Sequence, residues 1–154
     1  MGPILNTWNG KLNAPKALLR SHDEARAELV RATMEGGRIA KAGKRVAELC
    51  LPHFEHEEKG VFPVLALLPY LEQGNLRPEM LDVIPLIHNF RAKHDAINDH
   101  HQLIVSAIED VLQGAHKEKN RDFAEFANNL RAHERIEGEV IYRTVVLIGK
   151  YLQE

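Results

Sequence analysis

Cysteine is almost missing from this chain of 154 residues, since Cys50 is the only one. A lone cysteine excludes an intramolecular disulfide framework and a thiolate-rich metal site. Long apolar runs are missing too, because no stretch reaches the roughly 18–20 residues that a membrane-spanning helix needs. The first residues also lack the basic and then apolar pattern of a secretory signal. We therefore expect a cytoplasmic protein without a membrane partner.

Neither sign of charge is in excess. The chain has 20 lysines and arginines against 22 aspartates and glutamates, which gives a formal net charge of -2 at pH 7. No basic run is long enough to follow a phosphate backbone, so nucleic acid is not an expected partner. What the sequence does have in quantity is histidine, with nine residues.

The hydrophobic spacing is helical nearly throughout, and no segment alternates with period two for long enough to indicate a strand. The pattern predicts helices over about 15–35, 38–67, 78–114 and 121–152, joined by short polar turns, and the third of them begins at either Pro78 or Ile84. Four such helices predict an all-α protein folded as an antiparallel up-down-up-down four-helix bundle. We expect a single domain over residues 1–154, with residues 1–13 as a lead-in segment.

The second predicted helix turns polar side chains toward its apolar face. At 100° per residue, His53 and Glu57 fall on the same side as Val46 and Leu49. Glu58, by contrast, is expected to face solvent. A histidine and a glutamate one turn apart are thus predicted to point into the core.

The other helices repeat this feature. His133 and Glu137 form the same His-x-x-x-Glu pair in the fourth predicted helix, on the face of Phe126. The first and third helices each contribute one inward histidine, His22 and His94. His101 shares the face of His94 one heptad later, about 10 Å along the helix. We expect His101 to make a core hydrogen bond or a polar path rather than to bind a metal directly.

Side chains on four antiparallel helices meet only if each turn lies midway between successive candidates. The midpoints fall beside Gly36 and Gly37, at Gly74, and at Gly114, and glycine is a usual turn residue. Six side chains are therefore predicted to converge at one level: His22, His53, Glu57, His94, His133 and Glu137.

One inward histidine is more often a hydrogen-bonded core residue than a ligand, but six converging groups favour another explanation. Burying ionised carboxylates without a cation costs several kcal/mol, and these faces carry no lysine or arginine. Imidazole and carboxylate without thiolate suit iron, manganese or zinc, and two glutamates able to bridge favour two metals. The pattern predicts a dinuclear metal site.

Four short motifs resemble the hemerythrin-like, or HHE cation-binding, domain family: "SHDEA", "HFEHEEKGVFP", "KHDAI" and "HERIEGEV" in chain order. The resemblance covers essentially the whole chain. It implies a non-haem pair of iron ions (Fe2+/Fe3+), oxo- or hydroxo-bridged, with Glu57 and Glu137 as bridging carboxylates. It also implies four terminal ligands: His22, His53, His94 and His133.

The sequence departs from the oxygen-carrying hemerythrins at Asn98, where their third helix has a second histidine. The remaining ligands look more like those of bacterial hemerythrin-like stress proteins and of the metal domain of iron-centre repair proteins. Two similarly coordinated irons would be expected from this set. The implied function is to react with or sense O2, peroxide or nitric oxide, or to handle iron, with an unidentified electron donor as a further partner. The alternatives are a reversible oxygen or metal carrier or sensor without turnover, and a structural zinc bundle.

Overall fold

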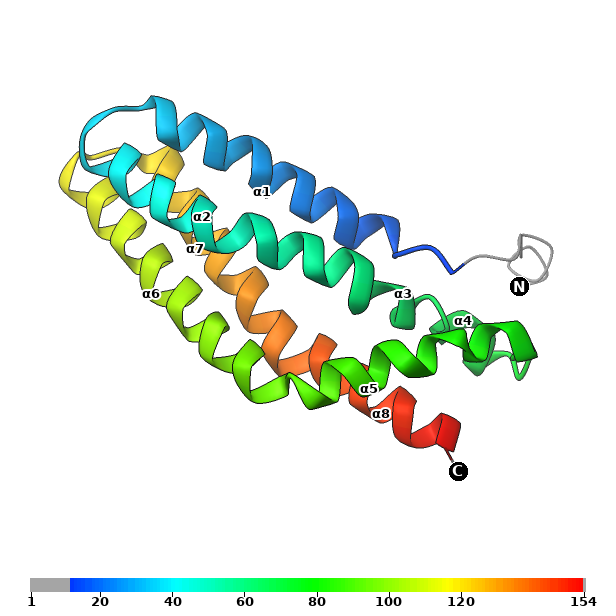
Figure 1. The fold of residues 1–154 in the computed structure, drawn as a ribbon. Helices are drawn as coiled ribbons and strands as arrows, with labels where there is room; N and C mark the ends of the chain where they lie inside the picture. Colours follow the sequence, from blue (N-terminus) through cyan, green and yellow to red (C-terminus); the bar gives the residue numbers. More distant parts are fainter. Residues whose placement is uncertain (1–11, 154) are drawn as a thin grey trace.

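The computed structural model describes residues 12–153, and every regular element in this range is helical (Figure 1). The predicted all-α class is therefore confirmed for these residues, while most of the predicted lead-in, 1–13, lies outside them. The elements in chain order are α1 (Lys16–Met34), α2 (Gly37–Gly60), α3 (Phe62–Leu65), α4 (Leu68–Glu72), the 3-10 helix η2 (Pro78–Val83), α5 (Ile84–Ala92), α6 (His94–Lys117), α7 (Arg121–Ile136), the π-helical turn η3 (Glu137–Ile141) and α8 (Tyr142–Gln153). Within this range, no helix combines the length and apolar character needed to cross a bilayer.

Helices α1, α2, α6 and α7 run alongside one another over most of their length (Figure 1). α2 packs against α1 and α6, α6 packs against α7, and α7 also touches α1. The shorter elements gather at one end, where α5 packs against α8 and α3 also contacts α8. Four long helices thus pack together, and the shorter helices pack at one end of this group.

Local chemistry explains where the first two long helices end. Gly36 and Gly37 form the turn after α1 with φ of 83° and 60°, a region that residues with a Cβ rarely adopt. α2 ends at Gly60 instead of continuing to Leu67 as predicted, because Pro63 has no N–H to give to the helix. The irregular α3–α4 segment follows.

The third predicted helix differs in two places. It breaks at Lys93, which separates α5 from α6. α6 then runs past Gly114, which is buried in the helix, and ends at Lys117. The turn comes at Lys119, whose φ is 54°, and the Asn120 side chain caps α7. The helix reversal therefore lies a few residues later than Gly114, where the sequence predicted it.

The buried apolar residues form two clusters. One includes Phe54 and Ile104, and the other includes Phe62 and Phe90. α2 contributes to the first cluster, and the α3 segment after it contributes to the second. α5 contributes to the second cluster, and α6 after it contributes to the first. α7 likewise contributes to the first cluster, and η3 and α8 after it contribute to the second. Each of these three segments of the chain therefore passes through a short region between the two apolar clusters.

Candidate metal centre

Polar side chains fill the stretch between the two apolar clusters. The buried polar or charged residues in the described range are His22, His53, Glu57, Glu134 and Glu137, all at most 6% exposed. The half-buried His101 and His133 lie beside them. α1, α2, α6, α7 and η3 all contribute to this set, which we call the His/Glu cluster.

The cluster consists of two overlapping groups whose potential ligand atoms lie within 4.8 Å of one another. The groups are His53, His101, Glu134 and Glu137, and His22, His133 and Glu137. Glu137 belongs to both because its oxygens point to different sides. Its Oε1 lies 3.4 Å from Nε2 of both His53 and His101, and its Oε2 lies 3.1 Å from Nε2 of His133. One carboxylate therefore faces two potential metal positions.

Glu57 also lies between the two groups. Its Oε1 is 3.4 Å from Nε2 of His22 and 3.2 Å from Nε2 of His53. Its Oε2 accepts a 3.0 Å hydrogen bond from the hydroxyl of Tyr142, which is 2% exposed. The phenol thus fixes the orientation of this carboxylate and leaves one oxygen free to face the histidines.

Several of these buried atoms have no hydrogen-bond partner in the described structure. They are Nε2 of His22, Oε1 of Glu57 and both carboxylate oxygens of Glu134, although Oε2 of Glu134 lies 2.5 Å from Nε2 of His101 as an ion pair. Leaving such groups unsatisfied away from water costs about 1–3 kcal/mol each, and in folded proteins a bound water or ion, or a functional role, commonly accounts for them. Imidazole nitrogen and carboxylate oxygen are good ligands for iron, manganese and zinc. The residues present therefore fit a metal, and the cluster could hold one.

Without a metal, protonation of the histidines compensates for the carboxylates. Burial disfavours the charged form of His22, but its interactions with the neighbouring carboxyl groups of Glu137, Glu57 and Glu58 outweigh this effect and raise the pKa of His22 to about 9. The same balance, with Glu134 and Glu137 as the main partners, raises the pKa of His53 to about 10 and that of His101 to about 9.

The two central carboxylates respond in opposite directions. Burial, together with the adjacent Glu137, raises the pKa of Glu57 well above its usual range. Burial also opposes ionisation of Glu137, but hydrogen bonds from Glu57 and from histidines such as His101 and His133 hold the pKa of Glu137 well below its usual range. The metal-free cluster therefore keeps a proton on Glu57 and a negative charge on Glu137.

Glu58 binds the ring nitrogen of His22 that does not face the other members of the cluster. The sequence predicted that it faces solvent, but it is only partly exposed and accepts a 3.0 Å hydrogen bond from Nδ1 of His22. Arg26 donates to both oxygens of Glu58 at 2.6 and 2.9 Å. With its Nδ1–H bonded to Glu58, His22 presents the unprotonated Nε2 to a metal, an arrangement that orients many metal-binding histidines.

Replacing Glu58 by alanine should therefore weaken the binding of one metal without abolishing it. Loss of such a partner typically costs about 10–100-fold in metal affinity. Competition titration with a chromophoric chelator would measure the effect, and Glu55→Ala is the matched control, since Glu55 pairs with the exposed Lys59 on the same helix. Equal affinities for the two variants would show that Glu58 does not position His22.

His94 does not join the cluster, contrary to the predicted convergence. It lies half-buried with its ring 5.8 Å from Phe90, and its Nδ1 is 3.5 Å from Nδ2 of the exposed Asn98. His101, which the sequence predicted to lie too far along the helix, takes the place facing His53 and Glu137. The break at Lys93 and the later turn into α7 explain this. A reversal around Lys119 puts the level of His133 and Glu137 opposite His101.

Two single substitutions separate these histidines. His101→Ala should remove most of the binding at one metal position, whereas His94→Ala should leave the metal content of the purified protein unchanged. Elemental analysis of both variants, prepared identically, gives the comparison. Loss of metal in the His94 variant alone would restore the sequence prediction.

Glu134 is a residue that the sequence reasoning missed. On a helical wheel centred on His133, Glu134 falls about 100° to one side. The buried face of α7 instead follows Phe123, Ala127, Leu130 and Glu134, which recur at the alternating spacings of four and three residues typical of a helical core face. Centring the wheel on those apolar residues would have identified Glu134 from the sequence.

The π-helical turn η3 comes directly after α7. It begins at Glu137 and ends at Ile141, where the chain resumes the α-helix as α8. Such turns insert one extra residue into a helix and occur often at functional sites. Here the turn begins at the carboxylate that both groups share.

The two groups of side chains do not have the same donors. Glu134 contributes only to the group of His53 and His101, so the group of His22 and His133 has one carboxylate fewer. Asn98 is exposed beside His94 and belongs to neither group. Comparison of the chain with protein-family models, with curated proteins and with solved structures found no match.

Proposed function

We propose that this protein is a hemerythrin-like, non-haem di-iron protein. In this proposal α1, α2, α6 and α7 form an up-down-up-down bundle, and two iron ions occupy the His/Glu cluster with Glu137 and Glu57 between them. The observation that carries the proposal is Glu137, whose two oxygens face two different groups of histidines. A single metal would leave one of these groups without a cation.

The donor set fits a pair of iron or manganese ions. It contains four imidazoles and three carboxylates, and the buried Cys50 belongs to neither group. Carboxylate-rich sites with paired histidines in helical cores are typical of di-iron and di-manganese proteins. Zinc remains a candidate on donor type alone, because imidazole and carboxylate bind it too.

When bound, an iron pair supplies a redox couple and a coordination position for a small ligand. The chain's own residues shape that chemistry. The two apolar clusters border the site on two sides, Glu58 orients His22, and Tyr142 holds Glu57. We propose that the protein reacts with or senses O2, peroxide or nitric oxide, or handles iron, in the cytoplasm, and receives electrons from a separate donor.

A reversible carrier or sensor without turnover is the second candidate. The inequality of the two groups favours it, because Glu134 gives one position an additional ligand and leaves the other more open. End-on binding of a ligand at one open metal suits reversible release. Two equally open metals would instead favour reaction with an oxidant.

Metal analysis and optical spectroscopy test these candidates. Protein purified without added metal should contain about two iron ions per chain, and a zinc content of that size would support the structural zinc bundle instead. The iron-loaded protein should then be reduced and exposed to oxygen, peroxide and nitric oxide. Repeated consumption of peroxide would support the reactive protein, whereas an oxygenated spectrum that disappears under argon and returns in air over many cycles would support the carrier.

A further inference from the structure

The two proposed metal positions differ in how many protein side chains could bind each metal, and therefore in the room left for an external ligand. Glu137 and Glu57 face both positions, so the difference comes from the other side chains. The position of His53 and His101 has Glu134 in addition, and the position of His22 and His133 has no such carboxylate. If the cluster holds two metals as proposed above, an external ligand meets fewer competing protein atoms beside His22 and His133.

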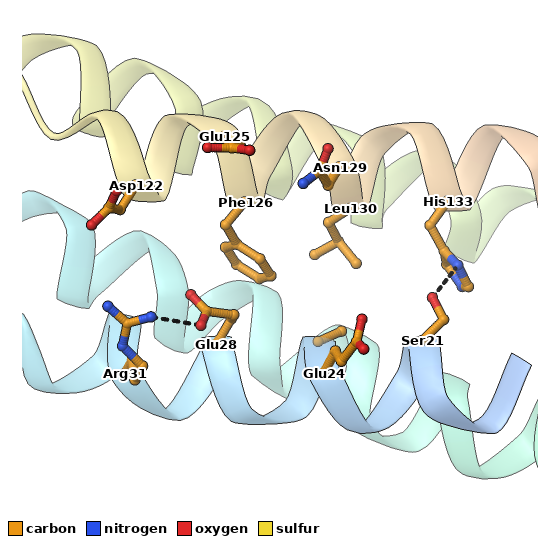
Figure 2. Close-up of a pocket in the computed structure, with 11 residues that line it drawn as sticks. Ser21, Glu24, Glu28, Arg31, Asp122, Glu125, Phe126, Asn129, Leu130 and His133 are labelled. Carbon is orange, nitrogen blue, oxygen red and sulfur yellow. Dashed lines mark hydrogen bonds and ion pairs between the residues drawn. The ribbon is translucent and has the colours of Figure 1, made fainter. Parts of the chain in front are cut away.

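A groove between α1 and α7 includes His133, one of the two histidines of this more open position, among its lining residues (Figure 2). Its volume is about 350 Å3, and Ser21 and His133 lie together at one end of it. Oγ of Ser21 and Nδ1 of His133 are 3.2 Å apart and hydrogen-bonded. Phe126 and Leu130 form apolar wall next to them. His133 thus connects the groove on one side with the His/Glu cluster on the other.

Four of the residues that line the groove are acidic. Glu24 and Glu28 on α1 lie across from Asp122 and Glu125 on α7 (Figure 2). Arg31 is the cation among the lining residues, and it is bound to Glu28 at 2.6 Å. Carboxylates concentrated along a cleft repel anions at low ionic strength and have little effect on uncharged molecules.

A second cleft, between α6 and α8, has the opposite character. His94, Arg143 and Lys150 line it, and Tyr142 lies at its base with its hydroxyl bonded to Glu57. None of the residues of the two metal-binding groups lines this cleft. It therefore provides a matched comparison, because it also lies next to the cluster but carries positive charge.

We propose that a small uncharged ligand reaches the metal position of His22 and His133 through the groove between α1 and α7, and that the carboxylates of this groove discriminate against anions. The ligand class is that of dioxygen and nitric oxide. The inference rests on the proposed di-iron function and adds to it the route and the charge selectivity.

Narrowing each route in turn tests the first part. Asn129 and Leu147 are exposed helix residues that line the groove and the cleft respectively, so a tryptophan at either should leave the fold intact. In iron-loaded, reduced protein, Asn129→Trp should slow nitric oxide association at least about fivefold, and Leu147→Trp should not. Dissociation should slow by the same factor, so that the affinity is unchanged, because a narrowed route affects both directions equally. A slower rate only in the Leu147 variant, or equal rates in all three proteins, would overturn the route.

Reversing the charge tests the second part. In oxidised protein at low salt, Glu24→Lys with Glu125→Lys should speed azide association about tenfold and leave nitric oxide association with reduced protein unchanged. The control pair Glu79→Lys with Asp82→Lys makes the same change in net charge on the exposed surface of η2. Equal azide rates in the two pairs would contradict the charge selectivity. Metal content, measured first, separates the proposals: a chain that holds no iron pair defeats the proposed function, and a loaded chain with unchanged rates defeats only this inference.

Discussion

Replacing Glu137 by alanine should reduce the metal content from about two ions per chain to one or none. The reason is geometric, because each oxygen of Glu137 faces a different group of histidines. Losing this side chain removes a ligand from both positions together and leaves His53, His101 and His133 without their common carboxylate. Elemental analysis and isothermal titration of the variant would measure both the number of sites and their affinities.

Glu139→Ala is the matched control. Glu139 lies two residues further along the same turn but is exposed and paired with Arg135 at 3.0 Å. Its variant should keep the full metal content. Glu57→Ala should fall between the two, since only one oxygen of Glu57 faces the histidines and Tyr142 holds the other. Two tightly bound metals in the Glu137 variant would show that this carboxylate is not shared.

Much of the cluster could be predicted from helical periodicity. His22, His53, Glu57, His133 and Glu137 were all expected to face inward at one level, and the structure brings them together. The pattern succeeds here because α1, the relevant part of α2 and α7 are regular helices. On such helices, neighbouring apolar residues determine which way a polar side chain points.

Periodicity fails where the helices are interrupted. The break at Lys93 and the extension of α6 to Lys117 exchange His94 for His101, and neither feature has a strong sequence signal. Gly114 was expected to be a turn residue, but it lies within α6 and packs closely against Arg38. Glycine permits either a turn or a close helix contact, and only tertiary packing decides between them.

The removal of metal leads to the second large expected effect. The sequence suggested carboxylates with no cation nearby, but the structure places imidazoles between them. In the metal-free protein these histidines bind protons instead, which is why the pKa values of His22, His53 and His101 lie at about 9, 10 and 9. The positive charge that the carboxylates require is then supplied by the protein itself.

The metal-free protein should therefore lose stability as the pH rises from about 6.5 to about 10. A histidine whose pKa is higher in the folded than in the unfolded state stabilises the fold fully below the unfolded value, about 6.5. This contribution disappears as the pH passes the folded value. The three histidines share the same carboxylates, so their effects are not additive, and we expect a total loss of about 3 kcal/mol in the free energy of unfolding. Metal-loaded protein should behave differently, because unprotonated imidazoles bind metal more strongly as the pH rises.

Urea unfolding with and without a chelator, at pH 6.5, 8 and 9.5, measures this difference, which should widen at each step. His53→Gln should flatten the pH dependence of the metal-free protein, because it removes the histidine with the highest pKa of the three. His88→Gln should not, since His88 is exposed and bonded to Gln153, far from the buried carboxylates. A metal-free protein whose stability is constant across this range would mean that the histidines do not replace the metal charge, and that the carboxylates of the cluster are either neutral or hydrated.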